Sequence, residues 1–146
     1  MFALDTNLLV YAHNRGSRFH DTASRFVQRV MTERDEAGKL LVCFPSQVIM
    51  EFLHVITSQR LESPLPLHEA LDVVQDYLST GIRVVHPRET QVQTSLEILR
   101  AMKSRKKIFD VAIAATLRDN GIGGFYTVNT DDFKNFDFLE VNNALT

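Results

Sequence analysis

The chain has 146 residues, of which 45% are apolar and 23% are charged, and its formal net charge is −2. We expect one domain spanning residues 1–146, because this length provides enough apolar surface for a core. The small negative charge argues against a strongly basic nucleic-acid-binding protein, although a mean value can hide a local basic patch. A single cysteine, Cys43, excludes an internal disulfide, and the five scattered histidines offer no zinc site beside it.

The sequence also lacks membrane and export signals. No apolar run is long enough to span a bilayer, and the N-terminus has no basic segment followed by a long apolar stretch and a cleavage site. Cys43 lies among apolar neighbours, as expected for a small core residue in a reducing compartment. These features predict a cytoplasmic protein without a membrane partner.

Short apolar runs alternate with segments of helical periodicity along the chain. Strands are predicted at residues 2–5, 40–44, 82–85 and 125–128, with a short fifth strand at 138–141. Helices are predicted from Thr6 or Asn7, at 21–31, from Ser46, and at 68–78, 90–102 and 108–120. This alternation predicts an α/β fold with three layers, α/β/α, around a central parallel sheet of four to five strands.

The spacing of apolar residues also predicts the buried faces of two helices. In the helix at 68–78 the predicted face is Leu71, Val74 and Leu78. In the helix at 90–102 it is Val92, Leu96, Leu99 and Met102.

Acidic residues interrupt apolar sequence at four places. Asp5 ends the first predicted strand, and Glu51 is surrounded by apolar neighbours, which predicts a buried carboxylate. Asp110 lies in the first turn of a predicted helix, and the turn at 129–132 carries two aspartates directly after a strand. Taken singly, these acids have simpler interpretations: a helix cap for Asp5, a dipole partner for Asp110 and ordinary turn residues at 129–132. Glu51 has no such interpretation.

Taken together, the acids predict a metal site. The carboxyl ends of parallel strands meet at one edge of the sheet, where α/β folds bind their ligands. A cluster of carboxylates raises the pKa values of its members, and hard divalent cations with oxygen ligands relieve that repulsion. Mg²⁺ or Mn²⁺ in such a site can polarise a phosphoryl oxygen and activate water.

The motifs resemble one protein family across nearly the whole chain. They are Ala3-Leu4-Asp5-Thr6-Asn7, Glu51, Phe109-Asp110-Val111-Ala112-Ile113-Ala114-Ala115-Thr116 and Thr127-Val128-Asn129-Thr130-Asp131-Asp132-Phe133. In this order and spacing they resemble the PIN-domain ribonucleases, and most closely the VapC-type toxins of bacterial toxin–antitoxin pairs. His20, just before a predicted helix, also matches a frequent position in that group.

The resemblance implies a divalent-metal-dependent endoribonuclease, the toxin of a toxin–antitoxin pair, that uses Mg²⁺ or Mn²⁺. Asp5, Glu51 and Asp110 would be the catalytic, metal-binding carboxylates. The family's fourth acid is replaced by Asn129, which could still offer a carbonyl oxygen, while Asp131 or Asp132 could contact a metal through water.

The same resemblance implies supporting residues and partners. Thr6, Asn7 and Thr127 would hold the carboxylates in place. The partners implied are RNA, an antitoxin protein that blocks the acidic site, and a second copy of the chain in a homodimer.

A basic segment directly precedes the Asp110 motif. It contains Arg100, Lys103, Arg105, Lys106 and Lys107. A solvated helix end is the simpler interpretation, but its position beside a metal-binding aspartate favours contacts to RNA phosphates. A looser group, Arg15, Arg18, Arg25 and Arg29, is more typical of a solvent-facing surface. No exposed aromatic residue for RNA bases is identifiable from the sequence, and the RNA target stays undefined.

Two other functions fit parts of the sequence. Asn129 in place of the fourth acid favours a degenerate PIN domain that binds RNA or a protein partner without cleavage. A phosphatase with Asp5 as nucleophile fits poorly, because the residue two positions on is Asn7 rather than an aspartate.

Overall fold

The computed structural model describes residues 1–102 and 107–146. Within these ranges five strands form one sheet in the order β3-β2-β1-β4-β5, and every neighbouring pair is parallel. The strands are β1 (Phe2–Leu4), β2 (Val42–Pro45), β3 (Arg83–Val85), β4 (Gly124–Thr127) and β5 (Glu140–Asn143). The predicted parallel sheet is therefore confirmed, with the fifth strand two residues later in the chain than expected.

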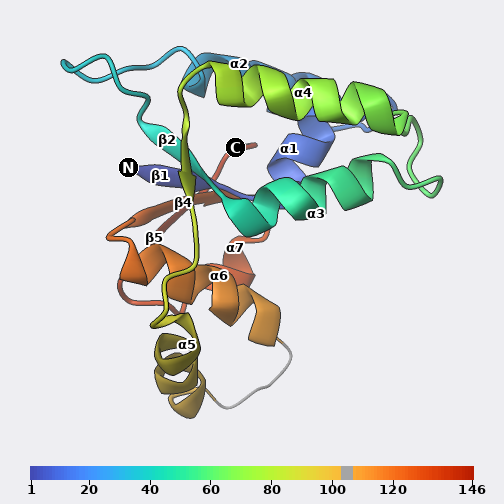
Figure 1. Cartoon of the computed structure of the whole chain (residues 1–146). Helices are drawn as coiled ribbons and strands as arrows, with labels where there is room; N and C mark the ends of the chain where they lie inside the picture. Colours follow the sequence, from blue (N-terminus) through green and yellow to red (C-terminus); the bar gives the residue numbers. More distant parts are fainter. Residues whose placement is uncertain (103–106) are drawn as a thin grey trace.

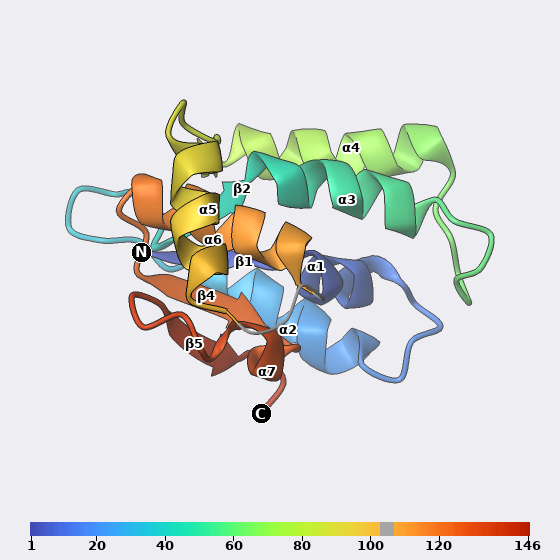
Figure 2. The ribbon, with the colours of Figure 1, turned by 90° about the horizontal axis from the view of Figure 1, so that it is seen from below.

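Helices cover both faces of this sheet. They are α1 (Thr6–His13), α2 (His20–Val30), α3 (Ser46–Ile56), α4 (Leu67–Ser79), α5 (Gln91–Arg100), α6 (Ile108–Asp119) and α7 (Thr130–Phe133). Figure 1 shows α1 to α4 on one side of the sheet and α5 and α6 on the other. In Figure 2 α5 lies over α6, outside the layer that contacts the strands. The predicted three-layer arrangement is confirmed.

The two layers of helices are held by two separate apolar clusters. Alternate residues of a strand point to opposite faces of the sheet. Leu4 and Phe44 accordingly pack with the helices α1 to α4, whereas Ala3 and Cys43 pack with α6. Cys43 is buried, as its apolar neighbours predicted.

The strand order places one crevice at the centre of the sheet. From β1 the chain builds β2 and β3 outward on one side, and it then crosses to build β4 and β5 on the other side of β1. The carboxyl ends of β1 and β4 lie next to each other at the point where this order reverses. Ligands of open α/β sheets bind in the crevice outside such a point. Asp5 and Asn129 both follow these strand ends.

The predicted buried face of α4 is confirmed at Val74 but wrong at Leu71 and Leu78. Leu71 is 48% exposed, whereas Ala70 is fully buried and Val73, Val74 and Tyr77 pack against the core. An apolar stripe shows that a helix has an inward face, but a small residue such as Ala70 can occupy that face while a leucine points outward. The periodicity therefore identified the helix but not its rotation.

The predicted face at residues 90–102 is wrong at the start of α5 and confirmed at its end. Val92 is 69% exposed and Leu96 is also exposed, while Thr94 is buried and its hydroxyl donates a hydrogen bond of 2.7 Å to Asp119. A polar contact with α6 therefore determines the orientation at the start of α5. Leu99 and Met102 do pack inward, as predicted.

The segment predicted as a turn at 129–132 forms part of a short helix, α7. Phe133 at its end is buried, and its ring centroid lies 4.7 Å from that of Phe125 in β4. This aromatic contact fixes the segment against the sheet, which local turn propensities do not reveal. Among the described residues, no helix combines the length and the apolar character needed to cross a bilayer.

The half-buried His13 connects α1 to α4 and predicts a pH dependence of stability. Its Nε2 atom lies 2.6 Å from the Tyr77 hydroxyl. Burial, with a smaller effect of His20, lowers the pKa of His13 from 6.5 to about 4. The unfolded chain therefore binds a proton below pH 6.5 that the folded chain binds only near pH 4, so stability is lost as the pH falls through this window.

We expect this loss to reach up to about 3 kcal/mol in the free energy of unfolding. Urea denaturation of wild type and His13→Gln at steps between pH 4 and 7.5 measures it, and the difference between the two curves isolates His13. This subtraction matters because the raised pKa of Asp5, about 6, acts in the opposite direction. His68→Gln, at an exposed histidine of α4, is the control. If the free energy of unfolding changed with pH equally in wild type and His13→Gln, the prediction would be contradicted.

Candidate active site

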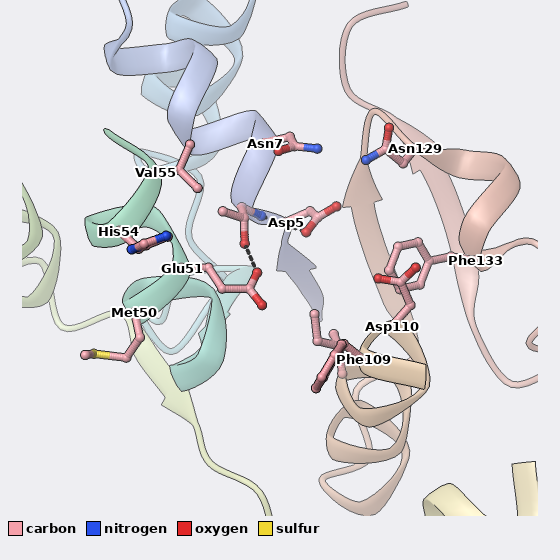
Figure 3. A pocket seen from close by; sticks show the side chains of 12 residues that line it. Asp5, Asn7, Met50, Glu51, His54, Val55, Phe109, Asp110, Asn129 and Phe133 are labelled. Atoms are coloured by element: carbon pink, nitrogen blue, oxygen red, sulfur yellow. Dashed lines mark hydrogen bonds between the residues drawn. The ribbon is translucent and has the colours of Figure 1, made fainter. Parts of the chain in front are cut away.

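A cleft of about 430 Å³ opens beyond the carboxyl ends of β1 and β4. Its acidic lining residues are Asp5, Glu51 and Asp110, which come from three separate parts of the chain. The other lining residues are Thr6, Asn7, Met50, His54, Val55, Phe109, Ile113, Asn129 and Phe133. Figure 3 shows the three carboxylates pointing into this space from the end of β1, from α3 and from α6. The fold thus brings together the three predicted catalytic carboxylates.

Asp5 is the deepest of these carboxylates, with only 7% of its surface exposed. It caps α1, because its Oδ1 accepts a hydrogen bond of 2.7 Å from the backbone N–H of Thr6. Its Oδ2 accepts a hydrogen bond of 2.6 Å from the Thr127 hydroxyl. Burial raises the pKa of Asp5 to about 6, the hydrogen bonds from Thr127 and Thr6 oppose this, and the nearby charges of Asp110 and Glu51 add to it.

Glu51 is half-buried rather than fully buried, which corrects the prediction from its apolar neighbours. On α3, Phe52 faces the core, but Met50 is 66% exposed. Glu51 lies between them at the edge of the cleft. Its Oε2 accepts a hydrogen bond of 2.8 Å from the Thr6 hydroxyl, and its Oε1 accepts one of 2.9 Å from the Gln47 side-chain amide.

Asp110 lies in the first turn of α6 and is half-buried. Burial raises its pKa, the charges of Asp132 and Glu51 raise it further, and Lys107 lowers it. The electrostatic influence of Glu51 on both Asp5 and Asp110 shows that the three carboxylates repel one another. Within residues 1–102 and 107–146, no lysine, arginine or histidine forms an ion pair with any of the three.

The residues predicted to complete the metal site do not all line the cleft. Asn129 lines the cleft, and its backbone N–H donates a hydrogen bond of 3.0 Å to the Thr127 hydroxyl oxygen. Asp132 does not line this cleft, and its carboxylate forms an ion pair of 2.8 Å with Lys107. Asn7 lines the cleft beside Asp5. Metal binding by Asn129 or Asp132 stays a prediction.

The predicted RNA-binding residues are only partly described. Arg100 ends α5 and is exposed, and Lys107 directly precedes α6. Lys103, Arg105 and Lys106 lie outside the described residues. His20 begins α2, where its Nδ1 atom lies 3.0 Å from the carbonyl oxygen of Tyr11, and it is not among the residues lining the cleft.

The donor set fits a hydrated magnesium or manganese ion. In the part of the chain that the structure describes, no three histidine, cysteine, aspartate or glutamate side chains are close enough to bind one ion directly. Mg²⁺, however, keeps several waters and is held by one or two carboxylates together with substrate phosphates. Asp5, Glu51 and Asp110 offer only oxygen atoms around one cleft, and their mutual repulsion would be relieved by such an ion.

Four further residues of the site were not recognised from the sequence. Gln47 fixes Glu51 from one turn earlier on α3, and this spacing of four residues was the available signal. Met50, His54 and Phe109 line the cleft. Apolar residues next to a helical apolar run suggest a core position, so the sequence carried no signal that Met50 and Phe109 would be exposed.

The chain matches a known protein family over nearly all of its length. The family model described as PIN domain matches residues 2–139. Ribonuclease VapC24 of Mycobacterium tuberculosis is 30% identical over 149 residues, covering 100% of this chain and 98% of the relative. Ribonuclease VapC48 of the same organism is 26% identical over 140 residues, covering 94% of this chain and 92% of the relative.

Solved structures share the fold at lower sequence identity. The crystal structure of VapC20 from Mycobacterium tuberculosis, described as a Sarcin-Ricin loop cleaving toxin, has a TM-score of 0.65 and 20% identity, covering 90% of this chain and 92% of that chain. DNA-bound VapBC from Salmonella typhimurium has a TM-score of 0.64 and 18% identity, covering 98% and 97%. The match to the family model over residues 2–139, together with the full-length relationship to VapC24, shows that the chain belongs to the PIN domain family, as a relative of the VapC ribonucleases.

Proposed function

We propose that this protein is a divalent-metal-dependent endoribonuclease that hydrolyses RNA phosphodiester bonds and acts as the toxin of a toxin–antitoxin pair in the cytoplasm. The observation that carries the proposal is the convergence of Asp5, Glu51 and Asp110 on one cleft at the carboxyl edge of the sheet. The full-length similarity to ribonuclease VapC24 supports RNA as the substrate.

The residues of the cleft have distinct roles in this proposal. Asp5, Glu51 and Asp110 would hold the metal, which would polarise a phosphoryl oxygen and lower the pKa of attacking water. Thr127 and the backbone N–H of Thr6 favour the ionised form of Asp5, because a hydrogen bond to a carboxylate stabilises its charge. The Thr6 hydroxyl and Gln47 fix the orientation of Glu51 toward the cleft.

The proposed protein partners are an antitoxin and a second copy of the chain. The solved VapBC complex from Salmonella typhimurium contains a toxin relative with its antitoxin, and this supports a corresponding partner here. Exposed apolar side chains of α4 and α5 offer surfaces for such contacts: Leu67, Leu71, Val92 and Leu96. A basic side chain of the antitoxin could pair with the acidic cleft and block it.

A PIN domain that binds without cutting is the second candidate. It is favoured by Asn129, which lines the cleft where the family resemblance expects an acid. The two candidates differ in one measurable property, since only the enzyme cleaves RNA in a manner that EDTA abolishes.

Cleavage of a mixed RNA pool in the presence of Mg²⁺ or Mn²⁺ tests the enzymatic function. We expect Asp110→Asn to lose at least about 100-fold of the cleavage rate, since even residues that only support metal ligands cost 10- to 100-fold. Its thermal stability should be equal or higher, because burial and neighbouring charges raise the pKa of Asp110. Asp72→Asn, at an exposed aspartate of α4 that does not line the cleft, is the matched control. Full activity of Asp110→Asn, or cleavage that persists in EDTA, would exclude the proposed role.

The position of Asn129 gives a separate prediction about metal affinity. Asn129→Asp adds a carboxylate to the cleft, and charge count governs affinity for hard cations, so calorimetry with Mn²⁺ should show several-fold tighter binding. Asp132→Asn should change the affinity less, because the Asp132 carboxylate pairs with Lys107 outside the lining of the cleft. The opposite ranking of the two variants would assign the fourth carboxylate to Asp132.

A further inference from the structure

Two exposed apolar side chains lie at the rim of the acidic cleft. Phe109 is 79% exposed and Met50 is 66% exposed, and both line the cleft. Figure 3 shows them on the same edge of the cleft, Met50 from α3 and Phe109 from α6, next to Glu51 and Asp110. Isolated apolar side chains are common on protein surfaces. These two, however, each directly precede a carboxylate of the site, from two elements that meet only in the folded protein.

Packing of the core does not account for either residue. The buried face of α6 consists of Val111, Ala114, Ala115 and Leu117, with Ile113 also buried. Burial of a phenylalanine side chain stabilises a fold, and Phe109 obtains little of this stabilisation because most of its surface faces solvent. The exposed ring therefore contributes little to the fold and remains free to contact a ligand.

An unpaired RNA base has the chemistry that fits these side chains. Proteins that bind single-stranded RNA stack splayed bases on aromatic rings, and every base presents a π-face for this contact. The methionine thioether also contacts aromatic rings favourably. Resting on the proposed ribonuclease function, we propose that Phe109 and Met50 form a base clamp that holds one unpaired base beside the phosphodiester to be cleaved.

Apart from the antitoxin proposed above, which would bring its own basic side chain, a second copy of the chain is another occupant to consider, and the charges around the clamp argue against it. Glu51 and Asp110 are the sequence neighbours of the two clamp residues and line the same cleft. A protein interface centred on Phe109 would remove water from these carboxylates, which is costly for charges left without a compensating partner. The cores of protein interfaces are accordingly depleted of charged residues. RNA brings its bases together with metal ions and water that suit an acidic cleft.

Binding of short single-stranded RNA containing 2-aminopurine tests the clamp, measured with Ca²⁺ in place of Mg²⁺ and Mn²⁺ so that a cation still compensates the three carboxylates while the proposed catalytic metals are absent. Stacking of one base is worth a factor of roughly 5 to 150 in affinity, so Phe109→Ala should weaken binding within this range. Phe109→Trp should retain affinity and quench 2-aminopurine fluorescence, and Phe109→Leu should lose the quenching. Met50→Ala should weaken binding by a smaller factor. Leu41→Ala, an exposed leucine beside the amino end of β2, is the control and should bind as wild type does.

RNA with one abasic nucleotide sharpens the test. Moving the abasic site along the oligonucleotide should locate one position where wild-type affinity falls to that of Phe109→Ala, and at that position the substitution should have no further effect. Equal weakening of Phe109→Ala for intact and abasic RNA would overturn the clamp. Unchanged melting temperatures are expected for all Phe109 variants, because the side chain is exposed.

The outcomes separate the clamp from the proposed function. If wild type cleaves RNA and Phe109→Ala and Phe109→Leu bind and cleave as wild type does, the clamp is wrong and the ribonuclease stands. If wild type does not cleave but Phe109→Ala weakens binding as described, the clamp stands and the nuclease is wrong. If Phe109→Ala instead alters self-association in sedimentation experiments without changing RNA affinity, a second copy occupies this surface and the clamp is overturned.

Discussion

The buried carboxylate of Asp5 is the constraint on which the cleft depends. A charge with so little exposure is costly unless hydrogen bonds satisfy it. The backbone N–H of Thr6 and the hydroxyl of Thr127 supply those bonds, which tie the end of β1 to the start of α1 and to the end of β4. The Thr6 hydroxyl extends the same network to Glu51, and Gln47 completes it on α3. One chain of hydrogen bonds therefore connects both sides of the point where the strand order reverses.

The electrostatics of the site agree with the proposed metal dependence. Burial raises the pKa values of Asp5 and Asp110, and the charges of neighbouring carboxylates raise them further. Selection for stability alone favours apolar or paired residues at such positions. The Lys107–Asp132 ion pair beside the cleft moderates the charge near Asp110 without neutralising the three carboxylates. A divalent cation held through waters would convert this repulsion into binding energy, and this is the physical basis of the proposed metal dependence.

The sequence predicted the parts of this structure that depend on repeated local patterns. Alternating strand and helix signals predicted the parallel sheet and its layers, and a charge in apolar surroundings singled out Asp5. Features that depend on contacts between different helices and strands were not predictable from the sequence. The inward face of α4 is determined by Ala70 and Tyr77, and the orientation of α5 by the hydrogen bond between Thr94 and Asp119. Phe133 at the end of α7 packs against Phe125 of β4, a contact between distant segments that turn propensities do not reveal.

The same difference explains why the clamp residues appeared only in the structure. Along α3 the exposure falls from Met50 through Glu51 to the buried Phe52. Along α6 it falls in the same way from Phe109 through Asp110 to Val111. Successive residues of a helix are rotated by about 100° around its axis. An acid between two apolar residues therefore lies at the boundary between core and solvent when only the second apolar residue faces the core. In the sequence, both segments contain an acid within an apolar run. In the folded protein, each segment places its carboxylate between the core and an exposed apolar side chain. Two such helices facing one cleft produce a site with an acidic floor and an apolar rim, and this matches a ligand that carries both a phosphate and a base.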